Sequence, residues 1–194
     1  MYKKLFEKSF LAGICIGLAA YIYLTVGGVI GAILFSVGLV GVLQFGLDLF
    51  TGKYGFYNLK TKKWYDWILY PLYILWGNVL GVVLVTICMP SVDPDIVNAI
   101  IQTRMTDNIG TLFAKGVGCG FLMTLAVYVY KQSKSYIGVL LCIPAFILSG
   151  MNHCIADIFY WYSDGLLNWR WFITVVGNWF GCILPMIYIE HKQR

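Results

Sequence analysis

The amino-acid sequence predicts an all-α integral membrane protein that forms a single domain over residues 1–194. The first observation is composition, because 60% of the residues are hydrophobic and only 12% are charged, against about 25% charged residues in a typical soluble domain. The second is spacing: the charges gather in clusters that leave apolar stretches close to the ~20 residues that a spanning helix needs. The third is an internal repeat, since the GNVLG sequence at Gly77 recurs as GNWFG at Gly177.

The apolar stretches are the six predicted transmembrane helices, and they comprise residues 10–27, 29–50, 67–89, 109–130, 137–160 and 171–189. The first stretch could also be a cleavable secretory signal, because lysines precede it. We favour a retained helix, since the stretch is longer than the apolar region of a signal. Its Gly13 and Gly17 also have counterparts in the fourth stretch, at Gly116 and Gly120.

The distribution of Lys and Arg predicts the orientation, because positively charged loops stay in the cytoplasm. All of the 14 Lys and Arg residues except Arg104, Lys115 and Arg170 fall on one side, including the basic cluster at residues 60–63. We therefore expect a multi-pass protein of the cell membrane with both termini in the cytoplasm. The net charge of +5 follows from this topology. It gives no reason to expect nucleic acid as a partner, and the lipid bilayer is the expected environment.

Each half of the chain, about residues 1–92 and 105–194, is predicted to contain three spans. An odd number of spans makes the second half enter the membrane from the opposite side, which gives two inverted three-helix repeats. Folds of this kind place a substrate path near the membrane midplane, between interrupted helices. Asn78 and Asn178 are expected to bind the backbone groups that such interruptions set free, and the glycines beside them to permit close helix packing.

The second and fifth spans carry the residues expected at a helix interruption. Four glycines and the polar Gln44 and Asp48 lie between residues 38 and 52, and a polar run at residues 149–157 divides the fifth span. Glycine readily adopts the positive φ that an interruption needs. Irregular backbone at membrane depth must be covered by protein or must line a wet cavity, so the two interruptions predict a buried path.

Thr51 and His153 are the candidate polar pair at the centre of this path, because an internal offset of about 102 residues makes them equivalent positions of the two halves. Histidine changes charge near neutral pH and can carry a proton across the middle of a path. Two plainer interpretations stay open. His153 can be a hydrogen-bonded packing residue, and the Thr51 hydroxyl can bind backbone groups freed by the interruption.

Four motifs, in order along nearly the whole chain, resemble the formate/nitrite transporter family; they are Leu49-Phe50-Thr51-Gly52, Lys115-Gly116-Val117-Gly118-Cys119, Ser149-Gly150-x-x-His153-x-Ile155-Ala156 and Gly177-Asn178-x-x-Gly181. The resemblance implies six helices with the second and fifth interrupted, in an aquaporin-like outline. It also implies a homo-pentamer with one pore in each protomer. The expected cargo is a small monovalent anion such as formate, nitrite or hydrosulfide, commonly moved with a proton.

The resemblance also assigns pathway roles by position. His153 matches the central pore histidine, Thr51 matches the threonine that faces it, and Arg104 stands where the family has a vestibule lysine. Two apolar constrictions follow, with Phe35 and Phe146 on the outer side and Leu39, Leu49 and Phe50 on the inner side. On composition alone these apolar residues would be core or lipid-facing. Lys115 is a second candidate cation at the outer end, although it can also extend to the lipid headgroups.

The chain departs from the family pattern at Gly120, Asn152 and Asp157, where the family has asparagine, glutamate and asparagine. Gly120 removes a polar group from the expected pathway. If the helix resumes just after the interruption, Asp157 lies at i+4 from His153 and on the same helix face. Its carboxylate is then expected to hold the imidazole in the protonated form.

The expected function is therefore a proton-linked channel or transporter for small monovalent anions. A bare anion at the bilayer centre is strongly penalised by desolvation, whereas its neutral acid is small enough to cross apolar constrictions. The alternatives are a channel for neutral small solutes, as in aquaporins and urea channels, and a membrane scaffold subunit. No enzyme activity is expected, because no nucleophile with a base and an orienting partner is evident. No metal or cofactor is expected, since the six cysteines show no CxxC or zinc-site spacing.

Overall fold

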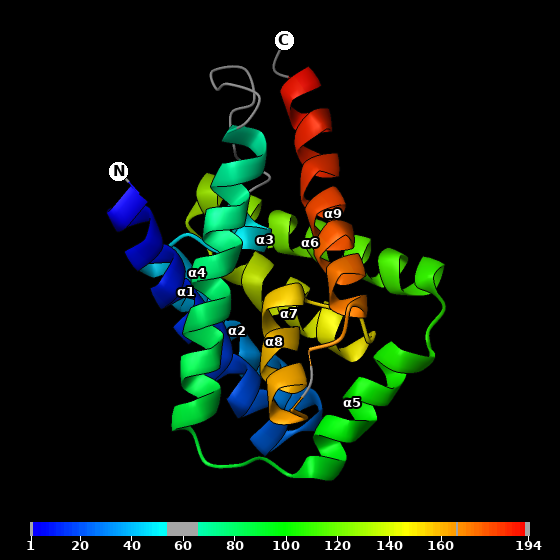
Figure 1. Cartoon of the computed structure of the whole chain (residues 1–194). Coiled ribbons are helices and arrows are strands. Elements are labelled where there is room, and N and C mark those ends of the chain that lie inside the picture. The colour runs from blue at the N-terminus through cyan, green and yellow to red at the C-terminus, as the bar shows by residue number, and fades with distance from the viewer. Residues whose placement is uncertain (1, 54–65, 166, 193–194) are drawn as a thin grey trace.

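A computed structural model describes residues 2–53, 66–165 and 167–192, and those residues fold into helices joined by short connections (Figure 1). The helices are α1 (Tyr2–Val26), α2 (Gly28–Gln44), α3 (Phe50–Lys53), α4 (Asp66–Cys88), α5 (Pro94–Thr106), α6 (Ile109–Ser133), α7 (Ile137–Leu148), α8 (Cys154–Ser163) and α9 (Arg170–Lys192). The basic cluster at residues 60–63, which contributes to the predicted orientation, lies outside the described residues.

Four of these helices are long and apolar enough to cross a membrane, as judged by length and composition: α1, α4, α6 and α9. The second and fifth predicted spans are each divided, into α2 and α3 and into α7 and α8, so the predicted interruptions are confirmed. The sequence did not predict α5. Pro94 at its start, with Asp93 accepting a hydrogen bond from the backbone N–H of Asp95 at 2.9 Å, begins this helix between two spans.

Close glycine contacts pack the long helices in two pairs, α1 with α4 and α6 with α9. A methyl group at Gly13 would overlap the carbonyl of Asn78, and one at Gly120 would overlap the carbonyl of Asn178. Gly13 and Gly120 are therefore the equivalent positions. The predicted pairing of Gly13 with Gly116 is wrong by one helical turn, because the connecting segments of the two halves differ in length and one offset does not fit every helix pair.

The two interruptions are built alike. Gly46 follows α2 with a φ of 62°, and Gly150 follows α7 with a φ of 69°. The residue after each glycine closes the turn, since Leu47 N–H donates to the Val42 carbonyl at 2.9 Å and Met151 N–H to the Phe146 carbonyl at 3.0 Å. This glycine-ended arrangement is the Schellman motif. Both helices end at exposed positions of the single chain, and the segments that follow, residues 48–52 and 152–161, are buried.

Asn78 and Asn178 bind the backbone where the chain becomes helical again. Asn78 Oδ1 accepts from the N–H of Phe50 at 2.8 Å, and Asn178 Oδ1 accepts from the N–H of Cys154 at 2.8 Å. The amide nitrogens donate to the carbonyls of Asp48 at 3.0 Å and of Asn152 at 2.8 Å, and also to the neighbouring long helix. The expectation that these asparagines bind the freed backbone groups is confirmed.

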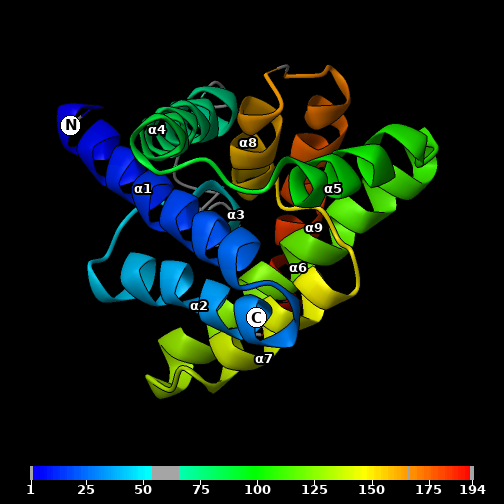
Figure 2. The same cartoon turned by 90° about the horizontal axis from the view of Figure 1, so that it is seen from below.

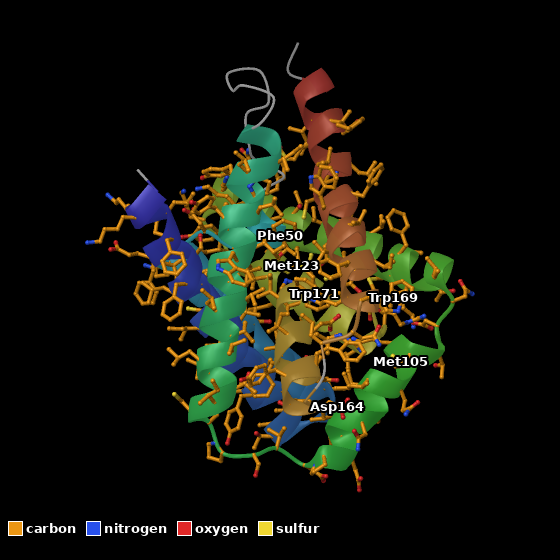
Figure 3. The ribbon with its side chains drawn as sticks, viewed as in Figure 1. Phe50, Met105, Met123, Asp164, Trp169 and Trp171 are labelled. Carbon is orange, nitrogen blue, oxygen red and sulfur yellow. The ribbon has the colours of Figure 1, made fainter. Side chains whose placement is uncertain are left out.

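The same hydrogen bonds correct the predicted symmetry of the centre. They make Phe50 equivalent to Cys154, so the residue equivalent to His153 is Leu49 and not Thr51. Both views of the chain place α8 between the α1–α4 pair and α9 (Figures 1 and 2). Trp171 at the start of α9, labelled in Figure 3, donates its indole N–H to the Cys154 carbonyl at 2.7 Å and supports the start of α8.

Replacing Asn178 with Ala should destabilise the fold strongly. The change leaves the Cys154 N–H and the carbonyls of Asn152 and Gly116 without their partner, and unpaired buried groups cost about 1–3 kcal/mol each. We expect the apparent melting temperature in detergent to fall by roughly 10 °C or more. The matched control is Asn98→Ala on the exposed face of α5. Equal melting temperatures for the two variants would contradict this role of Asn178.

Candidate functional site

The side chains of Thr51 and His153 meet in the interior, although they are not symmetry equivalents. Thr51 Oγ1 lies 2.9 Å from His153 Nε2, and both residues are almost completely buried. Thr51 lies in the first turn of α3, and His153 is the N-cap of α8. They meet because the two helices start close to each other at the centre. The predicted contact is therefore present, although the predicted reason, symmetry equivalence of the two residues, is wrong.

The hydrogen bonds of His153 define which ring nitrogen carries the proton. His153 has the extended backbone of an N-cap residue, with φ −104° and ψ 107°, and its ring turns back so that Nδ1 accepts the backbone N–H of Ala156 at 3.1 Å. An accepting Nδ1 has no proton, so the neutral ring carries its proton on Nε2. The Nε2–H then donates to the Thr51 hydroxyl oxygen. A second ring proton at Nδ1 would face the Ala156 N–H donor.

Aromatic rings cover one side of this pair. The Phe146 ring stacks on the His153 imidazole with 5.7 Å between centroids and 20° between planes. The Phe35 ring meets Phe146 edge-on at 6.1 Å, and Tyr23 meets Phe35 at 6.5 Å. The structure thus brings Phe35 and Phe146 together beside His153, as the sequence predicts. Tyr23, which the sequence analysis missed, extends the aromatic stack to α1.

Leu39, Leu49 and Phe50 are buried in the same apolar core as the aromatic pair. Leu39 and Leu49 are enclosed, with exposed fractions of 0% and 1%. Phe50 also lines a separate apolar groove of about 270 Å³ between α4 and α9. Their role as an inner constriction stays a prediction, and Phe50 in addition packs between the two long helices.

A cavity of about 210 Å³ reaches His153 from the side of α5, and we call it the vestibule. Its described wall contains Tyr23, Ala99, Ile100, Thr103, Arg104, Phe146, Ile147, Gly150, Met151, His153, Ala156, Asp157 and Tyr160. A water molecule occupies about 30 Å³ in the liquid, so the vestibule has room for a small solute with a few waters. Arg104, His153 and Phe146 are therefore brought to one cavity, as expected for a path.

Asp157 does not bind His153, and this prediction is wrong. Its Oδ1 accepts from the Arg104 Nε at 3.0 Å and from the Arg104 Nη2 at 2.6 Å. The i+4 argument failed because His153, as an N-cap, lies outside the regular helix and turns its ring toward the Ala156 N–H. The guanidinium comes from α5, a helix that the sequence did not predict, and it also lies over the Tyr160 ring at 5.4 Å.

Lys115 and Gly120 do not belong to the described wall of the vestibule. Lys115 Nζ pairs with Asp107 Oδ2 at 2.7 Å, and Gly120 lies at the crossing of α6 and α9. Arg170, another residue that the sequence analysis missed, donates to the carbonyls of Arg104 and Asp107 and ties the end of α5 to α9. Both missed contacts are long-range, and no local sequence pattern signals them.

Residues 1–192 match the formate/nitrite transporter family. The nitrite transporters NirC of Salmonella typhimurium and Escherichia coli are each 29% identical to this chain over 175 residues, which cover 78% of this chain and 64% and 65% of the relatives. A formate-nitrite transporter of Entamoeba histolytica is 24% identical over 228 residues, covering 96% of this chain and 64% of the relative. The chain thus spans just under two thirds of the length of these curated relatives.

Solved structures share the fold. A structure described as a pentameric formate channel with formate bound has a TM-score of 0.80 and 25% identity, over 100% of this chain and 98% of that chain. A structure described as an FNT family ion channel has a TM-score of 0.86 and 21% identity, over 98% of this chain and 90% of that chain. The second likeness concerns the fold alone.

The tautomer of His153 can be measured directly. Nitrogen-15 NMR of ring-labelled protein in bilayers at neutral pH should show an unprotonated Nδ1 and a protonated Nε2, because Nδ1 accepts the Ala156 N–H. The chain has two histidines, so a His191→Ala variant leaves the His153 signal alone in the spectrum. A protonated Nδ1 in that variant would contradict the hydrogen-bond assignment.

Proposed function

The chain belongs to the formate/nitrite transporter family, a family of channels and transporters and not of enzymes, and from this premise we propose that it moves small monovalent anions of the formate, nitrite or hydrosulfide type across the membrane, each with a proton bound to it as it passes the central His153. It is an all-helical, multi-pass membrane protein with the fold of that family. Two halves of opposite orientation in an aquaporin-like outline are part of the proposal.

The observation that carries the proposal is the hydrogen bond between Thr51 and His153 beneath an aromatic cover. These side chains put a hydroxyl and a ring N–H 2.9 Å apart in the buried interior, beside the rings of Phe35 and Phe146. A polar pair at such depth is costly unless it is satisfied. A small solute that replaces the contact between the two side chains would find one hydrogen-bond donor and one hydroxyl group.

The protonation state of His153 determines how the proton takes part. A neutral ring does not bind a bare anion by charge, and the anion at this depth is penalised by desolvation. Donation of a whole proton by His153 would first require a second ring proton at Nδ1, where the Ala156 N–H already donates. We therefore propose that the permeant crosses the centre as its neutral acid, with the His153 N–H and the Thr51 hydroxyl as hydrogen-bonding partners.

The half-helix α8 supports the same path electrostatically. α8 begins at Cys154, next to His153, and its ten residues direct the positive end of the helix dipole toward the centre. Partial positive charge there favours an oxygen or sulfur atom that carries negative charge density. It acts without placing a full charge in the apolar interior.

A channel for neutral solutes is the second candidate function. It is favoured by one specific observation, because the Arg104 charge is compensated by Asp157 at 2.6 Å and the vestibule holds no uncompensated cation among its described residues. The uptake of an uncharged solute such as urea separates this candidate from a path for weak acids.

Uptake of formate, nitrite and hydrosulfide into proteoliposomes tests the proposed function. Flux should rise by up to about tenfold for each unit of external acidification, because the fraction of neutral acid rises with proton activity. His153→Ala should reduce flux by roughly five- to 100-fold at both about pH 5.5 and about pH 7.5, because a buried hydrogen bond to the permeant is lost. His191→Ala is the matched control. Equal urea permeation, with no effect of His153→Ala, would instead establish the neutral-solute channel.

We also propose that the chain assembles as a homo-pentamer in the cell membrane, with both termini in the cytoplasm and one pore per protomer. The likeness to a pentameric formate channel supports this state. Many large apolar side chains of the long helices are exposed on the single chain, which suits contact with lipid and with further copies.

Native mass spectrometry from mild detergent tests the assembly. The expected species is five copies of the 21.9 kDa chain, retained when bound lipid is removed by collisional activation. A monomer as the dominant species across several detergents would contradict the pentamer. If the monomer dominates, uptake measurements on the same preparation would still test transport through the proposed pore of each protomer.

A further inference from the structure

The vestibule contains a buried ion pair that the proposed path leaves unexplained. Arg104 from α5 and Asp157 from α8 are the charged residues of its described wall, and their charged groups lie 2.6 Å apart. The exposed fractions of the two side chains are 10% and 1%. At this separation, and with so little contact with water, the two charges cancel for any solute that approaches from the cavity.

We propose that Asp157 is a specificity-determining residue of the vestibule: it neutralises Arg104 and makes the cavity select permeants that carry their own hydrogen-bond donor over bare anions of strong acids. The inference rests on the proposed function and adds a substrate preference to it. The favoured class comprises neutral weak acids with an O–H group and sulfur species with an S–H group. The disfavoured class comprises chloride, nitrate and similar anions without a proton.

The first argument is the absence of net charge. A lone guanidinium beside the path would raise the local concentration of every monovalent anion. Arg104 cannot do this, because two of its N–H groups are directed to one oxygen of Asp157, at 3.0 and 2.6 Å, and a third reaches the Ile100 carbonyl at 3.2 Å. Two further cations lie near the end of α5, outside the described wall of the vestibule: Lys115 is paired with Asp107, and Arg170 donates to the carbonyls of Arg104 and Asp107.

The second argument is the unused carboxylate oxygen. Both donors from Arg104 go to Oδ1 of Asp157, and Oδ2 is buried without a hydrogen-bond partner among the residues that the structure describes. In its ion pair with Arg104 the carboxylate accepts two N–H groups on one oxygen, and an ionised carboxylate only accepts hydrogen bonds. Asp157 lines the vestibule, so a small movement of its side chain would let this oxygen accept a hydrogen bond from the O–H or S–H group of a solute. The carboxylate repels a bare anion.

A purely structural role of the ion pair makes a different prediction from the proposed one. If the pair only ties α5 to α8, removing either partner should harm transport in the same direction. If the pair sets the charge of the vestibule, the two removals should act in opposite directions. Changes that remove one charge at a time provide this comparison, because Asp157→Asn leaves a net charge of +1 and Arg104→Gln leaves −1, while the double variant is again neutral.

The test compares nitrate and chloride uptake with formate and hydrosulfide uptake in proteoliposomes at equal concentrations. The natural chain should carry strong-acid anions at least about tenfold more slowly than the weak-acid permeants. Asp157→Asn should raise the nitrate-to-formate ratio by about tenfold or more. Arg104→Gln should lower that ratio, and the double variant should return it toward the natural value. Asp164→Asn, an exposed carboxylate at the far end of α8 (Figure 3), is the matched control.

The possible outcomes distinguish failure of the role of Asp157 from failure of the proposed transport function. If the natural chain carries no anion at all, the proposed function fails. If it carries formate and nitrate equally well, or if both single variants shift the ratio in the same direction, the role of Asp157 is overturned while the channel stands. The comparison in the natural chain requires no variant, so failure of Asp157→Asn to fold leaves the proposal open to refutation.

Discussion

The structure depends on one constraint, which is that two interrupted helices restart inside the buried interior. Each interruption frees backbone N–H and C=O groups where water is scarce, and such groups are costly when unpaired. Gly46 and Gly150 close the helix ends, and Asn78 and Asn178 bind the groups at the restarts. Each asparagine also donates to a neighbouring long helix, at Ser9 or Gly116, so one amide joins three segments of chain. The close packing of α1 with α4 and of α6 with α9 brings the amides within reach.

The restarts in turn create the candidate site. His153 is the last non-helical residue before α8, which frees its ring to accept the Ala156 N–H and to reach Thr51 on α3. Its counterpart in the first half, Leu49, has an apolar side chain. The centre is therefore asymmetric in chemistry although the backbone repeats, because an imidazole in the second half corresponds to a leucine in the first. One wall holds the polar pair, and the aromatic rings of Phe35 and Phe146 cover it.

Charge compensation is the second theme of the site. In the described part of the chain, the charged groups of Arg104 and Asp157 in the vestibule lie 2.6 Å apart. The Ala156 N–H, which donates to His153 Nδ1, favours the neutral form of the central imidazole. Both devices lower the penalty of burying polar groups. Neither offers a full positive charge to a passing anion. This is consistent with a path in which the proton travels with the permeant, as proposed, and it gives the departure at Asp157 a physical role.

The sequence by itself determined the membrane class, the four long apolar helices and the two interruptions, because apolar length and glycine or polar residues within an apolar stretch are local properties of the chain. It also named Thr51 and His153, but through a symmetry that the structure corrects. Tertiary structure decided the rest. The helix α5, the Arg104–Asp157 pair and the contacts of Arg170 join segments far apart in the sequence. One constant offset in residue number also failed to match equivalent residues of the two halves, because loops of different length separate the equivalent helices. The contacts of the packed glycines and the asparagine amides show which residues correspond. Long-range hydrogen bonds and ion pairs carry no periodic signature, and so they become visible only when the helices are packed together.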